Sequence, residues 1–277
     1  MRFVKMQATG NDYVYVTENE TEGKDLSALA AEISDRRTGI GSDGLIVLSA
    51  AGGEEEKEYE LKMRIFNADG SEGVTCGNGV RCAAKFAYEK MGITANPMRV
   101  LTGSGIRSVR MMESDGKIVY AEAEMGKPHT FALDPRQRAC MEEVGLYVDY
   151  RSIIPVNVGN LHLVFFEENE KSPLMLAKLV ESGGAFPDGI NIEQARAIPG
   201  GFAVRVTERG SGETFSCGSG AVAVAYAALQ TARVSAEDGE RGVGIGMRGG
   251  RLQVRFEGET AYLRGKIGEV FTGNYEI

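Results

Sequence analysis

Short runs of apolar residues, several of them alternating with polar ones, recur along the chain and predict β-strands. The runs cover residues 2–6, 13–16, 45–48, 59–67, 117–125, 162–166, 201–209 and 251–256. Segments with helical character lie between them. The pattern therefore indicates a mixed fold of many short strands and a few helices.

Two segments repeat apolar residues at helical spacing. In residues 24–37 the apolar positions on one helical face are Leu26, Leu29, Ala30 and Ile33. Residues 172–184 carry end signals: Ser172 as a candidate N-cap, Pro173 at the first helical position and Gly183 past the end. These residue types are preferred at those positions because they satisfy or tolerate the unpaired backbone groups of helix ends. Both segments are predicted to be helices.

Two further helices are expected directly after Cys76 and Cys217, where the sequence reads CGNGVRCAAKFAY and CGSGAVAVAYAAL. Both stretches open with Cys-Gly-x-Gly and continue with small or apolar residues on nearly every side. A helix that is apolar almost all round is buried inside a protein. The sequence therefore predicts two buried central helices, each with a cysteine at its N-terminus.

The chain carries the same landmarks twice in the same order, and such a repeat decides the architecture. The landmarks are a Gly-Asn pair, an Asp-Gly pair and the cysteine of each Cys-Gly-x-Gly motif. They lie at Gly10, Asp43 and Cys76, and again at Gly159, Asp188 and Cys217. Neighbouring landmarks stand 33 positions apart in the first set and 29 apart in the second. We therefore predict an α+β fold of two pseudo-symmetric halves from a tandem duplication, each a curled, mainly antiparallel sheet with two helices, one of them central.

A cysteine at a helix N-terminus has distinctive chemistry. Unpaired backbone N–H groups and the helix dipole place positive charge there, which lowers the pKa of a thiol. The glycines that follow let a ligand approach the backbone, so a carboxylate fits on the N–H groups of Gly77 and Asn78 or of Gly218 and Ser219. If the two motifs face an active-site cleft between the halves, a small anion there has a sulfur atom on each side.

Two such thiols suit the inversion of a stereocentre beside a carboxylate. A thiolate removes the α-proton from one face while a thiol supplies a proton from the other, and the roles exchange in the reverse direction. The helix dipoles stabilise the negative charge that develops. The sequence shows no lysine context typical of pyridoxal phosphate (PLP) and no cluster of metal ligands. We therefore expect a reaction that uses no cofactor and no metal.

Composition narrows the choice of partners. The chain has 277 residues, 43% of them hydrophobic and 25% charged, as in an ordinary globular protein. Its net charge of -8 argues against a nucleic-acid partner. No apolar run reaches membrane-spanning length and no signal peptide is visible. Four cysteines without zinc spacing and two histidines argue against a metal site. We expect a cytoplasmic protein with reduced thiols and a small-molecule substrate.

The motifs together resemble the diaminopimelate epimerase family. The matching stretches, which run in order through nearly the whole chain, are GNDYVYV, RRTGIGSDGLIVL, RIFNADGSEGVTCGNGVRC, VNVGN, FPDGINIE and ERGSGETFSCGSGA. The resemblance implies PLP-independent interconversion of LL- and meso-diaminopimelate for lysine and peptidoglycan synthesis. It implies two halves, which we place at residues 1–122 and 123–265, with a C-terminal strand at 266–277 returning to the first half. We also expect a homodimer.

The resemblance assigns roles to particular residues. It implies that Cys76 and Cys217 are the catalytic acids and bases, and that His162 and Glu208 adjust their protonation. The implied carboxylate cradle is formed by Gly77, Asn78, Gly218 and Ser219. The implied substrate-binding side chains are Asn11, Asn67, Asn160, Asn191, Glu208 and Arg209. A guanidinium with several amides suits the charged distal end of diaminopimelate.

The chain departs from the family pattern at positions that bear on substrate preference. The departures are Gln7, Ala8 and Thr9 before the first Gly-Asn pair, Gly44, and Leu161. A second hypothesis is therefore a racemase on the same scaffold for another amino acid, such as histidine. A third, of a different class, is a ligand-binding or redox-sensing protein in which Cys76 and Cys217 form a regulatory disulfide.

Overall fold

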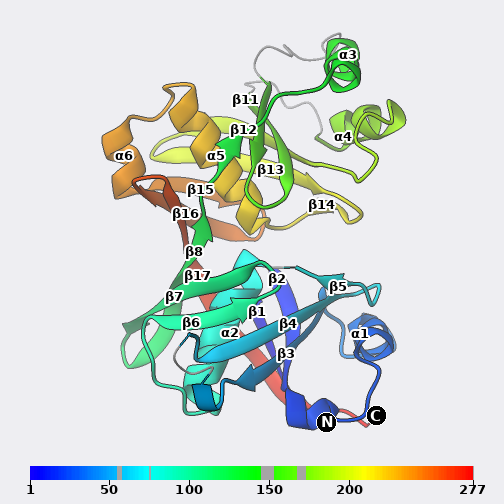
Figure 1. Cartoon of the computed structure of the whole chain (residues 1–277), viewed down its shortest axis with the longest axis vertical. Helices are drawn as coiled ribbons and strands as arrows, with labels where there is room; N and C mark the ends of the chain where they lie inside the picture. The colour runs from blue at the N-terminus through cyan, green and yellow to red at the C-terminus, as the bar shows by residue number, and fades with distance from the viewer. Residues whose placement is uncertain (55–57, 75, 145–152, 167–172, 277) are drawn as a thin grey trace. The chain divides into compact units, whose positions relative to one another are not determined.

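The computed structural model describes residues 1–54, 58–74, 76–144, 153–166 and 173–276 (Figure 1). The chain divides into two compact units. Unit 1 comprises residues 1–124 and 264–277, and unit 2 comprises residues 125–263. Both boundaries fall inside long strands, β8 (Lys117–Gly126) and β17 (Thr260–Asn274). The chain therefore passes from one unit to the other within β-strands.

Unit 1 is a ring of strands around one helix. Its strands are β1 (Arg2–Ala8), β2 (Asn11–Thr17), β3 (Gly44–Ala50), β4 (Leu61–Asn67), β5 (Glu72–Gly73), β6 (Met98–Thr102) and β7 (Gly105–Ser114), with parts of β8 and β17. Its helices are η1 (Glu18–Thr21), α1 (Leu26–Ser34) and α2 (Gly77–Lys90). Successive pairs along β1-β2-β3-β4-β6-β7 alternate between antiparallel and parallel. The pairs β7–β8, β8–β17 and β17–β1 close the ring.

Unit 2 repeats this plan. Its strands are β9 (His129–Thr130), β10 (Ile153–Asn157), β11 (Leu161–Phe166), β12 (Asn191–Ile198), β13 (Gly201–Glu208), β14 (Gly212–Thr214), β15 (Val243–Met247) and β16 (Gly250–Glu257). Its helices are α3 (Pro135–Val144), α4 (Pro173–Ser182), α5 (Gly218–Gln230) and α6 (Ala236–Arg241). Pairs along β10-β11-β12-β13-β15-β16 follow the same alternation as in unit 1. The shared pattern confirms the duplicated α+β fold expected from the sequence.

The expectation of two helices in each half is wrong for unit 2, where α3 and α6 are added to α4 and α5. Both added helices are polar, so they lack the apolar periodicity by which helices are recognised. The two helices predicted from periodicity are present as α1 and α4, and α4 begins at Pro173 as expected. The proposed N-cap Ser172 lies outside the described residues.

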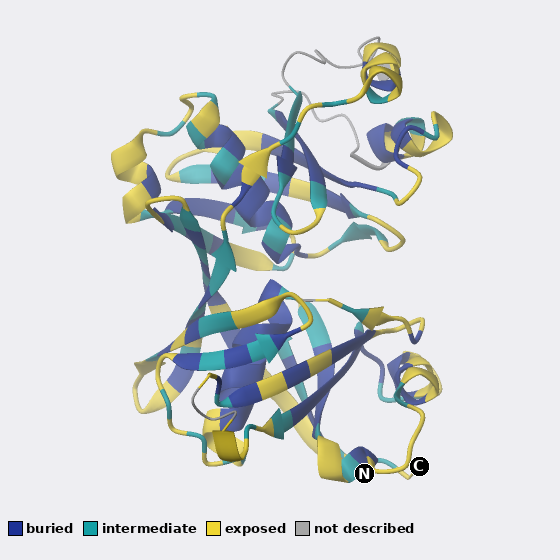
Figure 2. Cartoon of the chain, in the orientation of Figure 1, coloured by how far each residue is buried: buried dark blue, intermediate teal, exposed yellow. Residues whose placement is uncertain are grey.

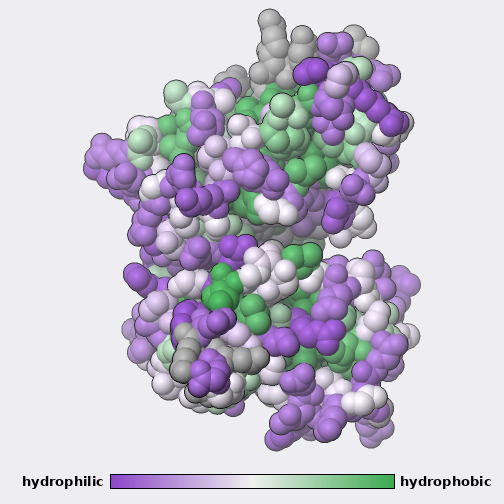
Figure 3. All heavy atoms as spheres, viewed as in Figure 1, coloured by the Kyte–Doolittle hydropathy of each residue, from purple (hydrophilic) through white to green (hydrophobic). Residues whose placement is uncertain are grey.

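Each unit buries two apolar clusters, seen as dark blue segments in Figure 2. One cluster surrounds the central helix, α2 or α5, and the other lies between the outer helices and the sheet. In α5 the valines at 222 and 224 are fully buried, and each contributes about 1.5–3 kcal/mol by leaving water. The face drawn in Figure 3 is mostly hydrophilic, with small hydrophobic patches. Among the described residues, no helix has the length and apolar character that a membrane crossing requires.

Candidate active site

Both predicted cysteine motifs form helix N-termini. Cys76 is the N-cap of α2, and its Sγ accepts a hydrogen bond from the backbone N–H of Gly79 at 3.2 Å. Cys217 is the N-cap of α5, and its Sγ accepts from the backbone N–H of Gly220 at 3.3 Å. Cysteine takes the place of the usual Ser, Thr, Asp or Asn cap. Each sulfur atom therefore lies at the positive end of a buried helix.

The second glycine of each motif is required by close packing. A Cβ atom on Gly79 would lie 2.9 Å from Cδ1 of Ile46 and 3.3 Å from Cβ of Cys76. A Cβ atom on Gly220 would lie 2.6 Å from Oε1 of Glu193. The missing side chain of this glycine therefore leaves room for the apolar Ile46 against α2 and for the carboxylate of Glu193 against α5.

In unit 1, Asn11 is held beside Cys76 by a charged network. The Asn11 Oδ1 lies 3.5 Å from Sγ of Cys76, and Asn11 Nδ2 donates to Asp43 Oδ2 at 2.6 Å. Asp43 also forms an ion pair with Arg36 at 3.0 Å. Arg36 forms a second pair with Asp12 at 2.7 Å. Because Asp43 takes the amide nitrogen, the amide oxygen of Asn11 is turned toward the thiol.

In unit 2, a buried acid that the sequence analysis missed lies beside the predicted residues. Glu193 Oε1 lies 2.7 Å from Nδ1 of His162, and both side chains are fully buried. The other ring nitrogen of His162 lies 3.0 Å from Oδ1 of Asn160. Glu193 Oε2 has no hydrogen-bond partner within the described parts of the chain. The available signal was an acidic residue at the end of the FPDGINIE stretch, in the half of β12 that is buried, but strand periodicity alone gives it no role.

Carboxylates and burial set the protonation of Cys217. Burial, followed by the charges of Glu208 and Glu193, raises the pKa of the Cys217 thiol well above its usual value, against the lowering effect of Ser219 and the Gly220 N–H. Burial also raises the pKa of Glu208, although hydrogen bonds from Thr214 and Cys217 oppose the shift. The expectation that a helix N-terminus lowers the thiol pKa is therefore wrong for Cys217. Desolvation and two nearby carboxylates outweigh the helix end.

The remaining predicted residues fall into two groups. Asn191 and Arg209 lie together, since Asn191 Oδ1 accepts the backbone N–H of Arg209 at 2.9 Å. The exposed Arg209 side chain donates from Nη1 to the carbonyl of Asp188 at 2.8 Å. Asn67 is exposed at the end of β4, and its Nδ2 donates to Ser71 Oγ at 2.9 Å.

The four residues expected to form a carboxylate cradle lie at the two helix ends. Gly77 and Asn78 form the first turn of α2, and Gly218 and Ser219 form the first turn of α5. The Ser219 Oγ lies 3.4 Å from Sγ of Cys217. All four cysteines are free thiols. Within the described residues, no group of three His, Cys, Asp or Glu side chains is arranged to hold a metal ion.

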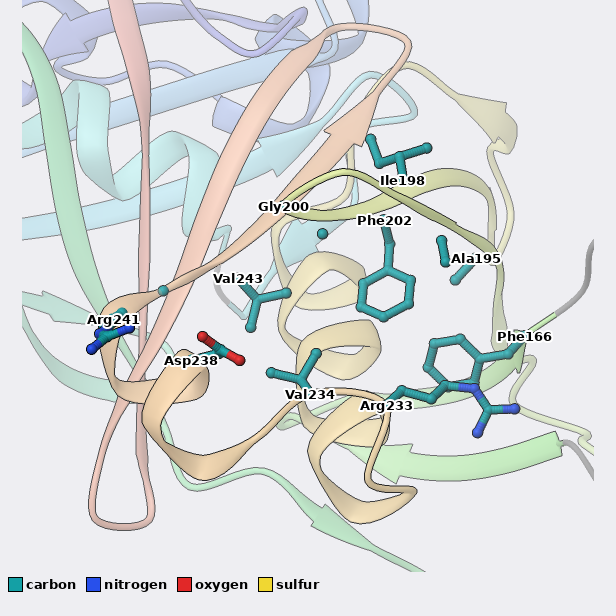
Figure 4. A pocket seen from close by; sticks show the side chains of 13 residues that line it. Phe166, Ala195, Ile198, Gly200, Phe202, Arg233, Val234, Asp238, Arg241 and Val243 are labelled. Atoms are coloured by element: carbon teal, nitrogen blue, oxygen red, sulfur yellow. The ribbon is translucent and has the colours of Figure 1, made fainter.

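A cavity of about 640 Å³ in unit 2 lies apart from these residues (Figure 4). Its floor contains Phe166 and Phe202, with their ring centroids 5.3 Å apart, and Arg233 lies over the Phe166 ring at 4.4 Å. Asp238 and Arg241 of α6 stand at its edge. None of the residues predicted for the site lines it. The candidate site is therefore defined by the helix ends and not by this cavity.

Comparison with known proteins points to one family. The sequence model of the family described as "Diaminopimelate epimerase" matches residues 3–131 and 154–273. A diaminopimelate epimerase from Caldanaerobacter subterraneus subsp. tengcongensis is 35% identical and covers 100% of both chains. One from Geobacillus kaustophilus is 35% identical over 91% of this chain and 88% of that protein.

Solved structures share the fold at low sequence identity. A PhzF-family phenazine biosynthesis protein from Bacillus anthracis has a TM-score of 0.73 at 14% identity, covering 100% of this chain and 99% of that one. A hydroxyproline epimerase from Agrobacterium vitis has a TM-score of 0.64 at 12% identity, covering 99% of this chain and 90% of that one. With its sequence matched over nearly its whole length, the chain belongs to the diaminopimelate epimerase family.

Proposed function

We propose that this protein interconverts LL- and meso-diaminopimelate by a two-thiol, PLP-independent reaction. The observation that carries the proposal is the pair of cysteine N-caps, Cys76 on α2 and Cys217 on α5, in duplicated surroundings. Each sulfur accepts a backbone N–H of its own helix, a contact that stabilises negative charge on sulfur, although burial and two carboxylates oppose it at Cys217. Membership of the diaminopimelate epimerase family supports the choice of substrate.

The reaction assigns complementary roles to the two thiols. One, as thiolate, removes the α-proton and becomes a thiol, while the other donates its proton to the opposite face of the same carbon and becomes a thiolate. Negative charge that develops on the carboxylate is stabilised by backbone N–H groups at a helix end, supplied by Gly77 and Asn78 or by Gly218 and Ser219. Inversion needs one thiol on each face, so both cysteines act on one substrate molecule.

The polar residues of each unit serve binding and protonation in this proposal. Asn11, fixed by Asp43, and Asn160, bonded to His162, orient the reacting amino-acid end. Arg209 suits the distal carboxylate because a guanidinium binds carboxylates in a bidentate manner. Its side chain is exposed, so it is accessible to ligand. The remaining substrate-binding assignments at Asn67 and Asn191 rest on the family resemblance.

The finer biological setting is also a proposal. We infer that the enzyme acts in lysine and peptidoglycan precursor synthesis, in the cytoplasm and as a homodimer. A cytoplasmic location keeps both thiols reduced, which the reaction requires.

The direct test is α-proton exchange in D₂O. Reduced protein is incubated with LL-diaminopimelate without added cofactor, and α-deuterium and meso product are followed by NMR. We expect exchange with the wild type and with Cys140→Ser, a buried thiol of α3 outside the site, and large losses with Cys76→Ser and Cys217→Ser. Exchange with free histidine but not with diaminopimelate would retain the two-thiol reaction and assign it a different amino-acid substrate. Absence of exchange with both would remove the enzymatic proposal in favour of ligand binding or redox sensing.

A further inference from the structure

Helix α2 buries a cation for which the described residues provide no carboxylate partner. Arg81 has an exposed fraction of 0%. Its Nε donates to the carbonyl of Gly77 at 3.1 Å, and its Nη2 donates to Oδ1 of Asn78, so both acceptors are neutral. Its Nη1 is buried and has no hydrogen-bond partner in the part of the chain that the structure describes. Buried charges are normally paired, so this guanidinium requires an explanation.

The position of the guanidinium places it next to the first turn of α2. Side chains on a helix point back toward its N-terminus, and Arg81 does so by bonding Gly77 and Asn78, the two residues that follow Cys76. The dipole of the helix disfavours a cation at this end. Burial lowers the pKa of Arg81 to about 10, which leaves it protonated at neutral pH. A nearby anion is needed to stabilise it.

The ionisable groups that act on Arg81 are Cys82, Cys76 and Tyr15. Burial raises the pKa of Cys82 to about 12. Burial also raises the pKa of Tyr15 well above its usual value. Both groups are therefore neutral at physiological pH, whereas the Cys76 sulfur accepts a helix N–H and is only partly buried. Cys76 is the group among the three that can supply the negative charge.

The carboxylates near Cys76 already have cationic partners. Asp43, which is linked to the thiol through Asn11, is paired with Arg36 at 3.0 Å. Asp12 is paired with Arg36 and with Lys5. The two carboxylates and two cations of this network balance one another, so the charge left unbalanced when Arg81 is added is positive.

The equivalent positions of unit 2 lack the cation and add carboxylates. Five residues after the cysteine, unit 1 has Arg81 and unit 2 has the buried Val222. Against the second glycine of the motif, unit 1 has Ile46 and unit 2 has Glu193. Glu208 adds a second carboxylate near Cys217. The duplicated helix ends therefore differ in charge, although their cysteine motifs match.

We propose that Arg81 is a positioning residue that makes Cys76 the first of the two thiols to lose its proton. Before substrate binds, Cys76 is then the thiolate and Cys217 the thiol; the assignment of catalytic roles to them rests on the proposed function. The printed contacts of the two sulfur atoms are alike in part, since each accepts a backbone N–H of its own helix. They differ in the oxygen neighbour: the Cys76 thiol donates to Asn11 Oδ1, whereas the Ser219 hydroxyl lies beside Cys217 Sγ. The surrounding charge decides the order, because ionising Cys76 neutralises a buried cation and ionising Cys217 adds a negative charge beside two carboxylates.

The test measures thiol ionisation without substrate. Protein is treated with iodoacetamide from about pH 5 to about pH 10, and alkylation at each cysteine is quantified by peptide mass spectrometry. The midpoint of each pH profile reports thiol ionisation, while its plateau reports access. In the wild type we expect the Cys76 midpoint to lie below that of Cys217. We expect Arg81→Met to raise the Cys76 midpoint by about one pH unit and to leave the Cys217 midpoint unchanged. Arg81→Lys keeps the positive charge, so we expect it to retain the lower Cys76 midpoint of the wild type.

Lys85 provides a matched control on the same helix. It is a buried cation one turn farther from Cys76, and it is bonded to Glu89 and to the carbonyl of Ile118. Lys85→Met removes a buried charge without altering the Cys76 midpoint if the inference holds. An equal shift with Lys85→Met, or no shift with Arg81→Met, overturns it. If Arg81→Met does not fold, a wild-type Cys76 midpoint at or above that of Cys217 overturns it, and a lower one retained in Arg81→Lys supports it.

This readout is separate from the proposed activity. Ordered midpoints with no α-proton exchange would leave the Arg81 assignment in place and remove the epimerase proposal. α-Proton exchange together with a Cys76 midpoint above that of Cys217 would support the epimerase proposal and overturn the Arg81 assignment.

Discussion

Gly220→Ala is expected to damage the site around Cys217 far more than its equivalent Gly79→Ala damages the site around Cys76. The new methyl group at position 220 would lie 2.6 Å from Oε1 and 3.2 Å from Cδ of Glu193. At position 79 it would lie 2.9 Å from the methyl end of Ile46. Both side chains are fully buried, but a shift of Ile46 breaks no hydrogen bond, whereas Glu193 is bonded to His162 at 2.7 Å.

The difference can be estimated from the contacts. Forcing a methyl group into a packed core costs about 1–3 kcal/mol. Displacing the Glu193 carboxylate from His162 leaves buried polar groups unpaired, at a further cost of about 1–3 kcal/mol. Replacing glycine by alanine in a helix returns up to about 1 kcal/mol. We therefore expect Gly220→Ala to lower the free energy of unfolding by about 3 kcal/mol, and Gly79→Ala, which meets the packing cost alone, to lower it by about 1 kcal/mol.

Urea denaturation followed by circular dichroism measures both variants against the wild type, and α-proton exchange measures their activity. The reasoning requires Gly220→Ala to lose stability and activity together. A Gly220→Ala protein as stable as Gly79→Ala would refute it, because the carboxylate would then move aside at no cost. Glu193→Gln combined with Gly220→Ala provides a check, since loss of the charge should recover part of the stability.

Two further predictions concern protonation. Glu208→Gln removes one of the charges that raise the pKa of Cys217, so alkylation of Cys217 at about pH 8 should quicken by up to about tenfold while Cys76 is unaffected; an unchanged rate would contradict the assigned cause. Burial alone would raise the pKa of Asp12, but hydrogen bonds from Arg36 and Lys5 outweigh it and lower the pKa. A carboxyl with a lowered pKa stabilises the fold above its unfolded pKa and loses that contribution as the pH falls through the folded value. The stability advantage of the wild type over Asp12→Asn should therefore shrink below about pH 4, and urea titrations that show a constant difference would exclude this effect.

The sequence by itself determined the features that depend on short stretches of chain. Cys76 and Cys217 are helix N-caps because a polar atom before a run of small residues satisfies the first N–H groups of a helix wherever that run occurs. The duplication was visible because both copies keep their landmarks in order. Apolar runs predicted β1, β2, β3, β4, β8, β11, β13 and β16, and helical periodicity predicted α1 and α4. The strands β6, β7, β10, β12 and β15 and the polar helices α3 and α6 were not predicted. The predicted features are local properties, and local spacing encodes them.

Only the tertiary structure decided what surrounds each thiol. Glu193 reaches Gly220 from β12, and Asp43 reaches Asn11 across the strands of unit 1, so no short stretch of sequence contains either pair. The prediction of a lowered pKa was wrong for Cys217 because it counted the helix end and not the burial and carboxylates brought by other strands. Long-range packing sets both desolvation and neighbouring charge, and these two terms dominate the ionisation of a buried group. Two matching motifs therefore acquire different electrostatic surroundings only when the chain has folded.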